Sequence, residues 1–476
     1  MLHTDGVWLP DGTCLPLPER LEHAGHLAEL VHELNLGTAT SPRTSEPGQL
    51  WVTPEALLEL FDLNPESDEL DPAAWLGEMS AQTSGSTLVD GALADGWELG
   101  GRTAGQLSRW TRIWKGDRRG VFIVLMSLIK ADPSTWPTLA DDPSPAVFAR
   151  RMQLLADAMQ FPFKVSAQTT GLDLASACRV KDRKEAFAPS DPCPPAEIPN
   201  VEADHNWVRK PTSDESRMRF VHAFDRGGSY AGAVAGLEMG IGDPEHVDGA
   251  VVFDKKLPGY WLIDRESWED WRVPHPLNLR ADANDGQVWV TTPTMEIASE
   301  LGLSPTIHQA WVWKRHARVL DGWYARVRDA RAALDTEDPD EQAARDQLKT
   351  VYTRLIGNFG SEALWRGRKG YAPERRHLIV AKARANLTRR FMQIGRDSGV
   401  WPLAVTADTL LYASDEPDPV KAWPGLDKSY GRGFGQFRWE ASGLMSEHLQ
   451  YLDPELDDMR SGRWLGKSSL STEPLE

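Results

Sequence analysis

The chain has 476 residues, enough for roughly two to four domains. Its formal net charge of −18 argues against a protein that coats nucleic acid indiscriminately, because phosphate contacts need clustered Lys and Arg. Its three cysteines, Cys14, Cys178 and Cys193, have neither metal-ligand spacing nor an even count for disulfides, which favours a reducing cytoplasm. We expect neither export nor a membrane span, because residues 1–6 do not resemble a signal peptide and the longest apolar run, 121–129, is too short for a bilayer.

The first part of the chain alternates helical and strand patterns. Helices are predicted over 21–36, 54–61 and 146–159, and strands over 51–52 and 120–129. This alternation predicts an α/β domain over residues 1–187. The domain ends in a proline-rich linker, 188–200, where neither a helix nor a central strand can continue.

Two apolar, strand-like segments further along each deliver one aspartate. Residues 221–230 carry Asp225, and residues 403–412 carry Asp408. A carboxylate at a strand end is a hard oxygen ligand for Mg²⁺ or Mn²⁺, and two such strands side by side can hold the metals of phosphoryl transfer. Either aspartate alone is more typical of a turn or a helix cap. The pair predicts a metal site shared by two strands.

Between these segments the chain is predicted to be helical and then basic. Residues 304–334 and 339–355 form a predicted antiparallel helical pair, interrupted at 335–338. The stretch 361–396 has ten Lys or Arg residues against two acids, with aromatic residues interleaved. Such a mixture can hold a phosphate backbone and stack bases, although a charge run by itself is more often a solvated helix face. The candidate nucleic-acid contacts in it are Trp365, Arg375, Arg376, Arg384, Arg389 and Arg390.

Five segments occur in one order along the chain: 225–230, 352–360, 379–384, the segment around Asp408, and 433–440. In this order they resemble the motifs of family-B DNA polymerases, above all the protein-primed ones. The resemblance implies that Asp225 and Asp408 are catalytic and bind Mg²⁺ or Mn²⁺. It also implies nucleotide contacts from Tyr230, which would lie under the incoming nucleotide, and from Lys349, Arg354 and Asn358.

The same resemblance implies a domain order and a fold class. The expected fold is α/β (α+β), with a polymerase-like palm over 201–440 and helical fingers at about 304–360. A degenerate exonuclease domain of ribonuclease-H-like fold would precede the palm in 1–187, and a reduced thumb or tail would follow it in 441–476. No Asp-x-Glu occurs in residues 1–200, so proofreading is not expected.

Other residues depart from the polymerase pattern. The lysine expected in the fingers falls on Tyr352, which makes Lys349, one helical turn earlier, the candidate in its place. Thr406 stands where the first aspartate of the catalytic pair would be, so two carboxylates remain. These departures predict a recognisable but weakened site.

Segments 253–259, 291–294 and 403–405 are similar to blocks of the telomere-associated proteins of actinobacterial linear chromosomes and plasmids. This narrower resemblance implies a cytoplasmic DNA-binding protein of replication that engages single-stranded DNA or DNA ends and recruits a priming terminal protein. The alternative is an active two-metal DNA polymerase or nucleotidyltransferase. The missing lysine and exonuclease acids favour the first function, and the two retained aspartates favour the second.

Overall fold

The computed structural model describes residues 1–41, 44–63, 86–100, 107, 110–117, 120–126, 134–164, 166–178, 183–188, 191–198, 201–249, 251–277, 286–362, 370–454 and 465–473. The chain is a mixed α/β protein with two compact units. Unit 1 is Met1–Leu174 with Ala325–Leu355, and unit 2 is Ala175–Tyr324 with Ile356–Glu476. These bounds differ from the predicted segments 1–187, 188–200, 201–440 and 441–476, whose assignment to an exonuclease-like domain, linker, palm and tail stays a prediction.

Unit 1 is built on a mixed seven-stranded sheet with the order β3-β2-β1-β6-β9-β8-β7. The central pairs β1–β6 and β6–β9 are parallel, and the flanking pairs are antiparallel. The strands are β1 (Leu2–His3), β2 (Gly6–Trp8), β3 (Cys14–Leu15), β6 (Gln49–Val52), β7 (Glu98–Gly100), β8 (Trp110–Trp114) and β9 (Val121–Leu125); a separate hairpin joins β4 (Thr38–Ser41) to β5 (Thr44–Glu46). The strand predicted at 51–52 is confirmed as part of β6. The strand predicted at 120–129 is confirmed over 121–125 as β9, and residues 127–129 lie outside the described part of the chain.

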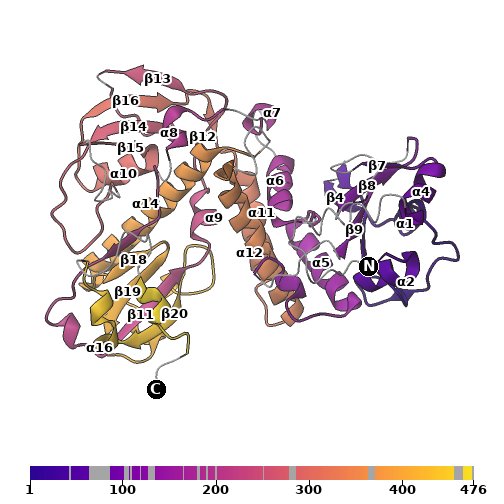
Figure 1. Ribbon diagram of the computed structural model, residues 1–476. Helices are drawn as coiled ribbons and strands as arrows, with labels where there is room; N and C mark the ends of the chain where they lie inside the picture. Colours follow the sequence, from indigo (N-terminus) through magenta and orange to yellow (C-terminus); the bar gives the residue numbers. More distant parts are fainter. Residues whose placement is uncertain are drawn as a thin grey trace. The chain divides into compact units, whose positions relative to one another are not determined.

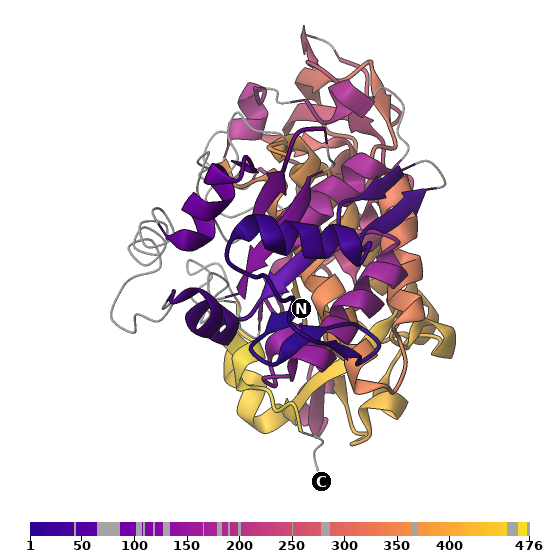
Figure 2. The same cartoon turned by 90° about the vertical axis from the view of Figure 1, so that its right-hand side faces the viewer.

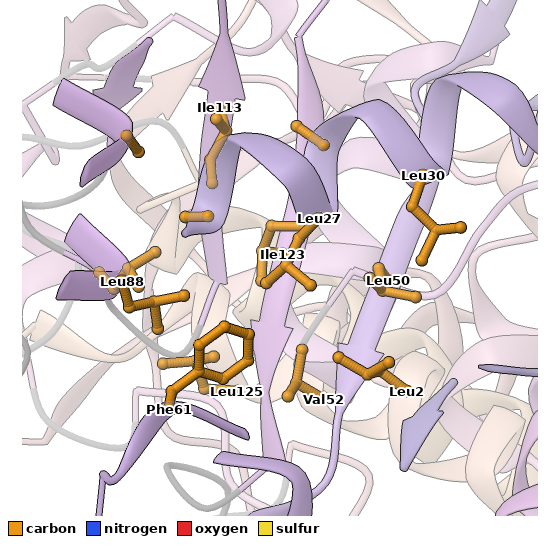
Figure 3. Packing of buried hydrophobic residues seen from close by; sticks show 14 of the residues in the cluster. Leu2, Leu27, Leu30, Leu50, Val52, Phe61, Leu88, Ile113, Ile123 and Leu125 are labelled. Carbon is orange, nitrogen blue, oxygen red and sulfur yellow. The ribbon is translucent and has the colours of Figure 1, made fainter. Parts of the chain in front are cut away.

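One face of this sheet carries the apolar core of unit 1 (Figure 3). Leu50 and Val52 alternate along β6, and Ile123 and Leu125 alternate along β9, as the two-residue period of a strand requires. They belong to one buried cluster with Leu27 of α1 (Ala24–Glu33). Full burial of such a side chain stabilises the fold by about 1.5–3 kcal/mol, so this face holds the sheet and helix together.

The helices of unit 1 begin at caps that the sequence provides. Thr53 Oγ1 accepts a hydrogen bond from the Ala56 amide (3.2 Å) at the start of α2 (Pro54–Phe61), and Ser144 Oγ accepts one from the Val147 amide (3.4 Å) at the start of α5 (Pro145–Met159). In both helices proline occupies the first turn, where its missing N–H costs nothing. The predicted helices over 21–36, 54–61 and 146–159 are therefore confirmed, the first with shorter ends.

The remaining helices of unit 1 include α4 (Thr87–Ala94) and α6 (Ala167–Ala177), and most of α11 (Asp321–Ala333) and α12 (Pro339–Phe359). The buried Arg151 of α5 donates to Asp141 at 2.5 and 2.8 Å and to Asp340 of α12 at 2.8 Å. This two-sided ion pair ties α12 to α5. In Figures 1 and 2 the N-terminal helices and sheet are indigo to purple.

Unit 2 contains a five-stranded, wholly antiparallel sheet with the order β10-β18-β19-β11-β20. Its strands are β10 (Asn206–Val208), β11 (Phe220–Arg226), β18 (Ala404–Thr406), β19 (Thr409–Ser414) and β20 (Phe437–Leu444). Strand β11 lies between β19 and β20; it is buried from Phe220 to Phe224, and its last two residues are half-buried. The sheet therefore has a dry middle and a polar end.

A second antiparallel sheet of unit 2 has the order β13-β16-β14-β15. Its strands are β13 (Glu245–Asp248), β14 (Gly259–Asp264), β15 (Gln287–Thr291) and β16 (Ile307–Val312), and α10 (Thr292–Glu300) follows β15 directly. Trp261, Val290 and Ala310 lie in one buried cluster with Met295 of α10. The pair β12 (Met239–Gly240) and β17 (His316–Ala317) lies outside both sheets.

Helix α14 (Pro373–Ser398) contacts the elements around both sheets of unit 2 (Figure 1). Near its start, His377 Nδ1 lies 2.8 Å from the Tyr260 hydroxyl of β14. Further along, Leu387 and Phe391 belong to the apolar cluster that includes Phe224 of β11. The short helices α7 (Arg183–Ala186), α8 (Pro194–Glu197) and α9 (Ser229–Ala233) complete this part of the unit, and α15 (Pro419–Ala422) and α16 (Met445–His448) follow near the C-terminus.

The predicted helical pair is only partly correct. The interruption at 335–338 is confirmed, since α11 ends at Ala333 and α12 begins at Pro339. The prediction of a helix from residue 304 is wrong, because 307–312 is β16 and 316–317 is β17. Strand β16 pairs with β13 on one side and β14 on the other, so tertiary pairing overrides a short apolar pattern that either structure could use.

Candidate active site

The two predicted aspartates lie next to each other at the polar end of the five-stranded sheet. Asp225 is the sixth residue of β11 and pairs in register with Thr409 of β19. Asp408 occupies the two-residue turn between β18 and β19, which the pairing of Thr406 with Thr409 closes. Its carbonyl oxygen accepts a hydrogen bond from the Arg226 amide (3.1 Å). The expectation that the two strands lie side by side is confirmed.

The hairpin turn bends through Ala407, whose φ of 51° is in the left-handed region that a non-glycine residue seldom adopts. A two-residue hairpin with a positive φ at its first turn position matches the right-handed twist of the flanking strands. The Ala407 amide donates to the carbonyl of His205 at 2.7 Å. The turn is therefore fixed from outside, and Asp408 with it.

The carboxyl of Asp408 is electrostatically unfavourable in its charged form. Burial raises its pKa from 3.8 to about 7, and repulsion from Asp225 and Asp204 adds to the rise, while Lys467 opposes it. Asp225 lies 3.6 Å from the Arg438 guanidinium, a long ion pair on a half-exposed surface. Repulsion between two close carboxylates favours protonation of one of them or the binding of a cation.

Tyr230 lies beside this pair. It is the second residue of α9, which begins directly after the β11 strand and the Gly227–Gly228 turn. Its hydroxyl donates to Asp204 Oδ1 at 2.6 Å. Burial, together with the charges of Asp204 and Asp408, raises the pKa of Tyr230 well above its usual value. The tyrosine therefore remains a neutral hydrogen-bond donor at any physiological pH.

Two charged residues of this site were missed by the sequence analysis. Asp204 precedes β10 by two residues, and no pattern in the sequence distinguishes it from other loop aspartates. Lys467 lies in the C-terminal segment, which was interpreted as a tail. Its Nζ is 2.9 Å from Glu440 and 2.7 Å from the Thr409 hydroxyl. Only the fold brings this lysine to the hairpin that carries Asp408.

Arginines cluster near the same strand ends. Burial, with the nearby charge of Arg390 from α14, lowers the pKa of Arg226 from 12.5 to about 10, and Asp408 opposes this. Arg226 stays protonated at neutral pH, and its Nε donates to the Gly435 carbonyl at 3.3 Å. Arg226, Arg390 and Arg438 thus place positive charge beside the two carboxylates.

The predicted nucleotide contacts divide between the two units. Lys349 and Arg354 are exposed on α12 in unit 1, whereas Asn358, near the end of the same helix, is half-buried and belongs to unit 2. Tyr352, at the position expected for the fingers lysine, is buried, and its hydroxyl accepts a hydrogen bond from Arg331 at 2.8 Å. A shared contact of Lys349, Arg354 and Asn358 with one nucleotide stays a prediction.

Two of the predicted nucleic-acid contacts have internal partners. Arg375 is buried, donates to the Ala186 carbonyl and stacks its guanidinium over Phe187 at 5.5 Å. Arg384 is buried in an ion pair with Glu202. Both side chains are buried, so neither guanidinium is exposed to a phosphate, and the internal contacts favour structural roles for both arginines.

The other basic-stretch candidates are more accessible. Arg389 is paired with Glu300 at 2.7 and 2.8 Å, and Arg390 donates to Gln393 at 3.1 Å. Arg376 is half-buried, and its guanidinium has no hydrogen bond or ion pair within the described part of the chain. Trp365 lies outside the described residues. Nucleic-acid binding by this stretch stays a prediction, with Arg376 and Arg390 as its best-placed members.

The donor set at Asp225 and Asp408 is chemically suited to a hard divalent cation. Among the described residues, no group of three or more His, Cys, Asp or Glu side chains has the arrangement of a metal site. Mg²⁺, however, is commonly held by one or two carboxylates together with substrate phosphates rather than by a protein cage. The two aspartates fit that mode, in which the substrate completes the site.

Unit 1 has a cavity of about 310 Å³. Trp8, Trp51, Phe148 and Phe163 contribute aromatic walls, and Gln49 contributes an amide. Of the residues that the structure describes, none with a charged side chain lines it. Its chemistry does not suit phosphate or metal, so the carboxylate pair remains the candidate active site.

No protein-family model matches the chain, and no curated protein matches its sequence. Solved structures of Phi29 DNA polymerase are similar to it in fold. The complex with primer-template DNA aligns with a TM-score of 0.45, 12% identity, 71% of this chain and 68% of that chain. The ternary complex with incoming nucleotide aligns with a TM-score of 0.43 and 13% identity, over 71% of this chain and 69% of that chain. The complex with single-stranded DNA aligns with a TM-score of 0.42 and 12% identity, over 72% of this chain and 68% of that chain. None of the described helices combines the length and apolar character needed to cross a membrane.

Proposed function

We propose that the chain is a DNA-binding protein of replication with a polymerase-like scaffold, which engages single-stranded DNA or the ends of linear DNA and recruits a terminal protein that primes replication there. Its DNA-binding part rests on one observation: Arg226, Arg390 and Arg438 cluster beside Asp225 and Asp408 in a chain of net charge −18. Concentrated positive charge in an acidic protein directs phosphate to one place. The recruitment of a terminal protein and the telomere-associated, actinobacterial assignment rest on the resemblance of 253–259, 291–294 and 403–405.

The binding part is tested by the salt dependence of DNA affinity. Arg390→Ala and Arg438→Ala should each weaken binding of a 3′-recessed duplex and reduce the slope of log affinity against log salt by roughly 0.7 to 0.9 per lost phosphate contact. Arg318→Ala is the matched control, because Arg318 is exposed and its partner, Glu238, lies outside the carboxylate site. Unchanged affinity and slope in both test variants would reject the proposed surface.

End recognition is tested separately with DNA topology. Affinity for an open linear duplex should exceed affinity for a closed circle of the same sequence at the same salt concentration. Equal affinities for the two forms would remove the end-specific part of the proposal and leave general DNA binding. Capture of a terminal protein on the linear form, and not on the circle, is the further outcome that recruitment requires.

A second function is favoured by a specific observation, the pairing of β11 with β19 that places Asp225 beside the Asp408 turn. In a nucleotidyltransferase, bound Mg²⁺ or Mn²⁺ would neutralise charge on the phosphates being transferred. Asp225 and Asp408 would supply its oxygen ligands, and Tyr230 would lie beside the sugar. Asp408 has to lose its proton before it can bind a cation, so binding should weaken below about pH 7, where its raised pKa lies.

Primer extension separates the two functions. We expect metal binding no tighter than millimolar and little or no processive synthesis, because Tyr352 replaces the fingers lysine and is held inside unit 1. Robust extension by the purified wild type, abolished by Asp225→Asn and by Asp408→Asn, would establish the second function instead. In either case both variants should retain DNA affinity, since a carboxylate that repels phosphate has been neutralised.

A further inference from the structure

We propose that Asp204 is a positioning residue of the carboxylate site: it holds the Tyr230 hydroxyl and so fixes the tyrosine ring beside Asp408. The inference rests on the proposed function for the identity of the ligand, a primed DNA end with its nucleotide. The contact itself is a hydrogen bond of 2.6 Å from the Tyr230 hydroxyl to Asp204 Oδ1. A hydroxyl that donates to a carboxylate forms one of the stronger classes of hydrogen bond.

The segment that carries Asp204 is anchored on its N-terminal side. Glu202 forms an ion pair with Arg384 of α14, and the two side chains are only 1% and 3% exposed. Glu202 Oε1 also accepts hydrogen bonds from the Thr291 amide (2.7 Å), the Thr291 hydroxyl (2.8 Å) and the Thr294 hydroxyl (2.8 Å). Because these groups come from the junction of β15 and α10, the backbone before Asp204 is fixed to two elements outside the five-stranded sheet.

The segment is anchored on its C-terminal side as well. The His205 carbonyl accepts the Ala407 amide at 2.7 Å, and His205 Nε2 lies 3.3 Å from the Thr388 hydroxyl of α14. The next residue, Asn206, pairs in register with Thr406. Asp204 is therefore fixed relative to the turn that carries Asp408, because the first of these contacts belongs to His205, the residue directly after it.

Tyr230 needs such a partner, because its own element gives it little support. Helix α9 spans only Ser229–Ala233, and the chain enters it through Gly228, whose φ is 58°. Tyr230 is half-buried, and the hydrogen bond to Asp204 holds the hydroxyl end of its ring in one direction. Asp204 has no ion pair within the described part of the chain, which leaves its carboxylate committed to this hydroxyl.

In this geometry the oxygen of Asp204 that accepts the hydrogen bond positions Tyr230, and the negative charge of Asp204 is not required. Asp204→Asn retains an oxygen that can accept the tyrosine hydroxyl, and Asp204→Ala removes it. Tyr230→Phe removes the donor from the other side. If positioning is the role, Ala and Phe should have the same effect and Asn should have almost none. If Asp204 were a metal ligand, Asn should be as damaging as Ala.

The experiment measures the dissociation constant of a 3′-recessed duplex with the next complementary nucleotide and Mn²⁺. Asp204→Ala and Tyr230→Phe should each weaken binding about fivefold to tenfold, the loss expected for one ordinary hydrogen bond at an exposed position. The double variant should be no weaker than the weaker single variant, and Asp204→Asn should stay within about twofold of wild type. Asp214→Ala is the control, because Asp214 is an exposed loop aspartate paired only with Arg217 on the surface.

Multiplicative effects in the double variant, or an Asn variant as weak as the Ala variant, would overturn the inference. A wild type that does not bind the duplex would reject the proposed function, which is a different failure. In that case the same cycle is measured on thermal unfolding midpoints, which need no ligand. Additive shifts of Asp204→Ala and Tyr230→Phe there would show that the two side chains are not coupled, and would overturn the inference by themselves.

Discussion

The seven-stranded sheet of unit 1 and the five-stranded sheet of unit 2 use the same alternation of side chains to different ends. In unit 1, β6 and β9 place Leu50, Val52, Ile123 and Leu125 in one dry cluster. In unit 2, β11 is equally buried along its first five residues, but its last two residues, Asp225 and Arg226, are charged and half-buried. The apolar parts of both sheets form the core, and the candidate site lies where β11 ends in the charged residues Asp225 and Arg226. The apolar cluster behind β6 and β9 should therefore be sensitive to side-chain volume, and the buried ion pair of Glu202 with Arg384 in unit 2 to charge.

The sharpest test of this difference is the buried ion pair of unit 2. Arg384→Met should lower the free energy of unfolding by about 3–5 kcal/mol, because it leaves Glu202 buried without its counter-charge. Urea denaturation measures the loss. Adding Glu202→Gln to the same chain should recover part of it, since the amide can still accept from Thr291 and Thr294. Arg318→Met, at an exposed pair, serves as the control and should change little.

In unit 1 the corresponding test is a change of volume without charge. Ile123→Ala should cost about 3 kcal/mol of unfolding free energy, through lost burial and the cavity left behind. Leu58→Ala, at an exposed position of α2, should cost far less. If Arg384→Met lowered the free energy of unfolding by less than Ile123→Ala does, the contrast between the two sheets would be removed.

The sequence was most informative where strands are long and apolar. Strand β11 was predictable because 221–224 are all apolar or aromatic apart from His222, and Asp225 follows them directly. The two-residue turn at Ala407–Asp408 fixes the place of the second aspartate by local geometry. Both halves of the carboxylate pair could therefore be selected from local patterns, and their adjacency needed only the assumption that the two strands are neighbours.

The sequence could not predict contacts between residues that lie far apart along the chain. Lys467 reaches Thr409 across 58 positions of chain, and Glu202 reaches Arg384 across 182. Neither contact can be predicted from the sequence, because two residues that lie far apart in the chain form no regular local spacing. The same limitation explains why 307–312 was taken for a helix: its strand character comes from β13 and β14 on either side. Charge density in 361–396 likewise could not reveal that Arg375 and Arg384 face inward.

A smaller effect should appear in the pH dependence of stability without metal. The folded-state pKa of Asp408, about 7, lies above its unfolded value near 3.8, so the folded state binds the proton more tightly between these values. Stability from this group is complete below about pH 4 and is lost as pH rises to 7. After allowance for solvent screening the loss is about 1–2 kcal/mol. Asp408→Asn should lack this component, and the wild-type minus variant difference in melting temperature across pH 4–8 measures it.

Addition of Mg²⁺ sharpens the same measurement. At pH 8, where Asp408 is charged, millimolar Mg²⁺ should raise the melting temperature of the wild type, and at pH 5 it should have much less effect. Asp408→Asn should not respond at either pH. A flat difference curve between wild type and variant would show that the two carboxylates are not coupled in the folded protein.

The smallest effect concerns Lys467, which carries the positive charge nearest to the hairpin from the C-terminal segment. Its Nζ contacts Glu440 and the Thr409 hydroxyl at a partly exposed surface, so Lys467→Met should cost no more than about 1 kcal/mol of unfolding free energy. Its electrostatic consequence is more specific. Lys467 lowers the pKa of Asp408, and its removal should move the midpoint of the Asp408 pH component upward. Lys421→Met, at an exposed pair with Asp418, should leave that midpoint unchanged. Because the two lysines contribute similar surface pairs, a midpoint that moves equally in both variants would mean that general charge, and not the position of Lys467 beside the hairpin, controls the proton on Asp408.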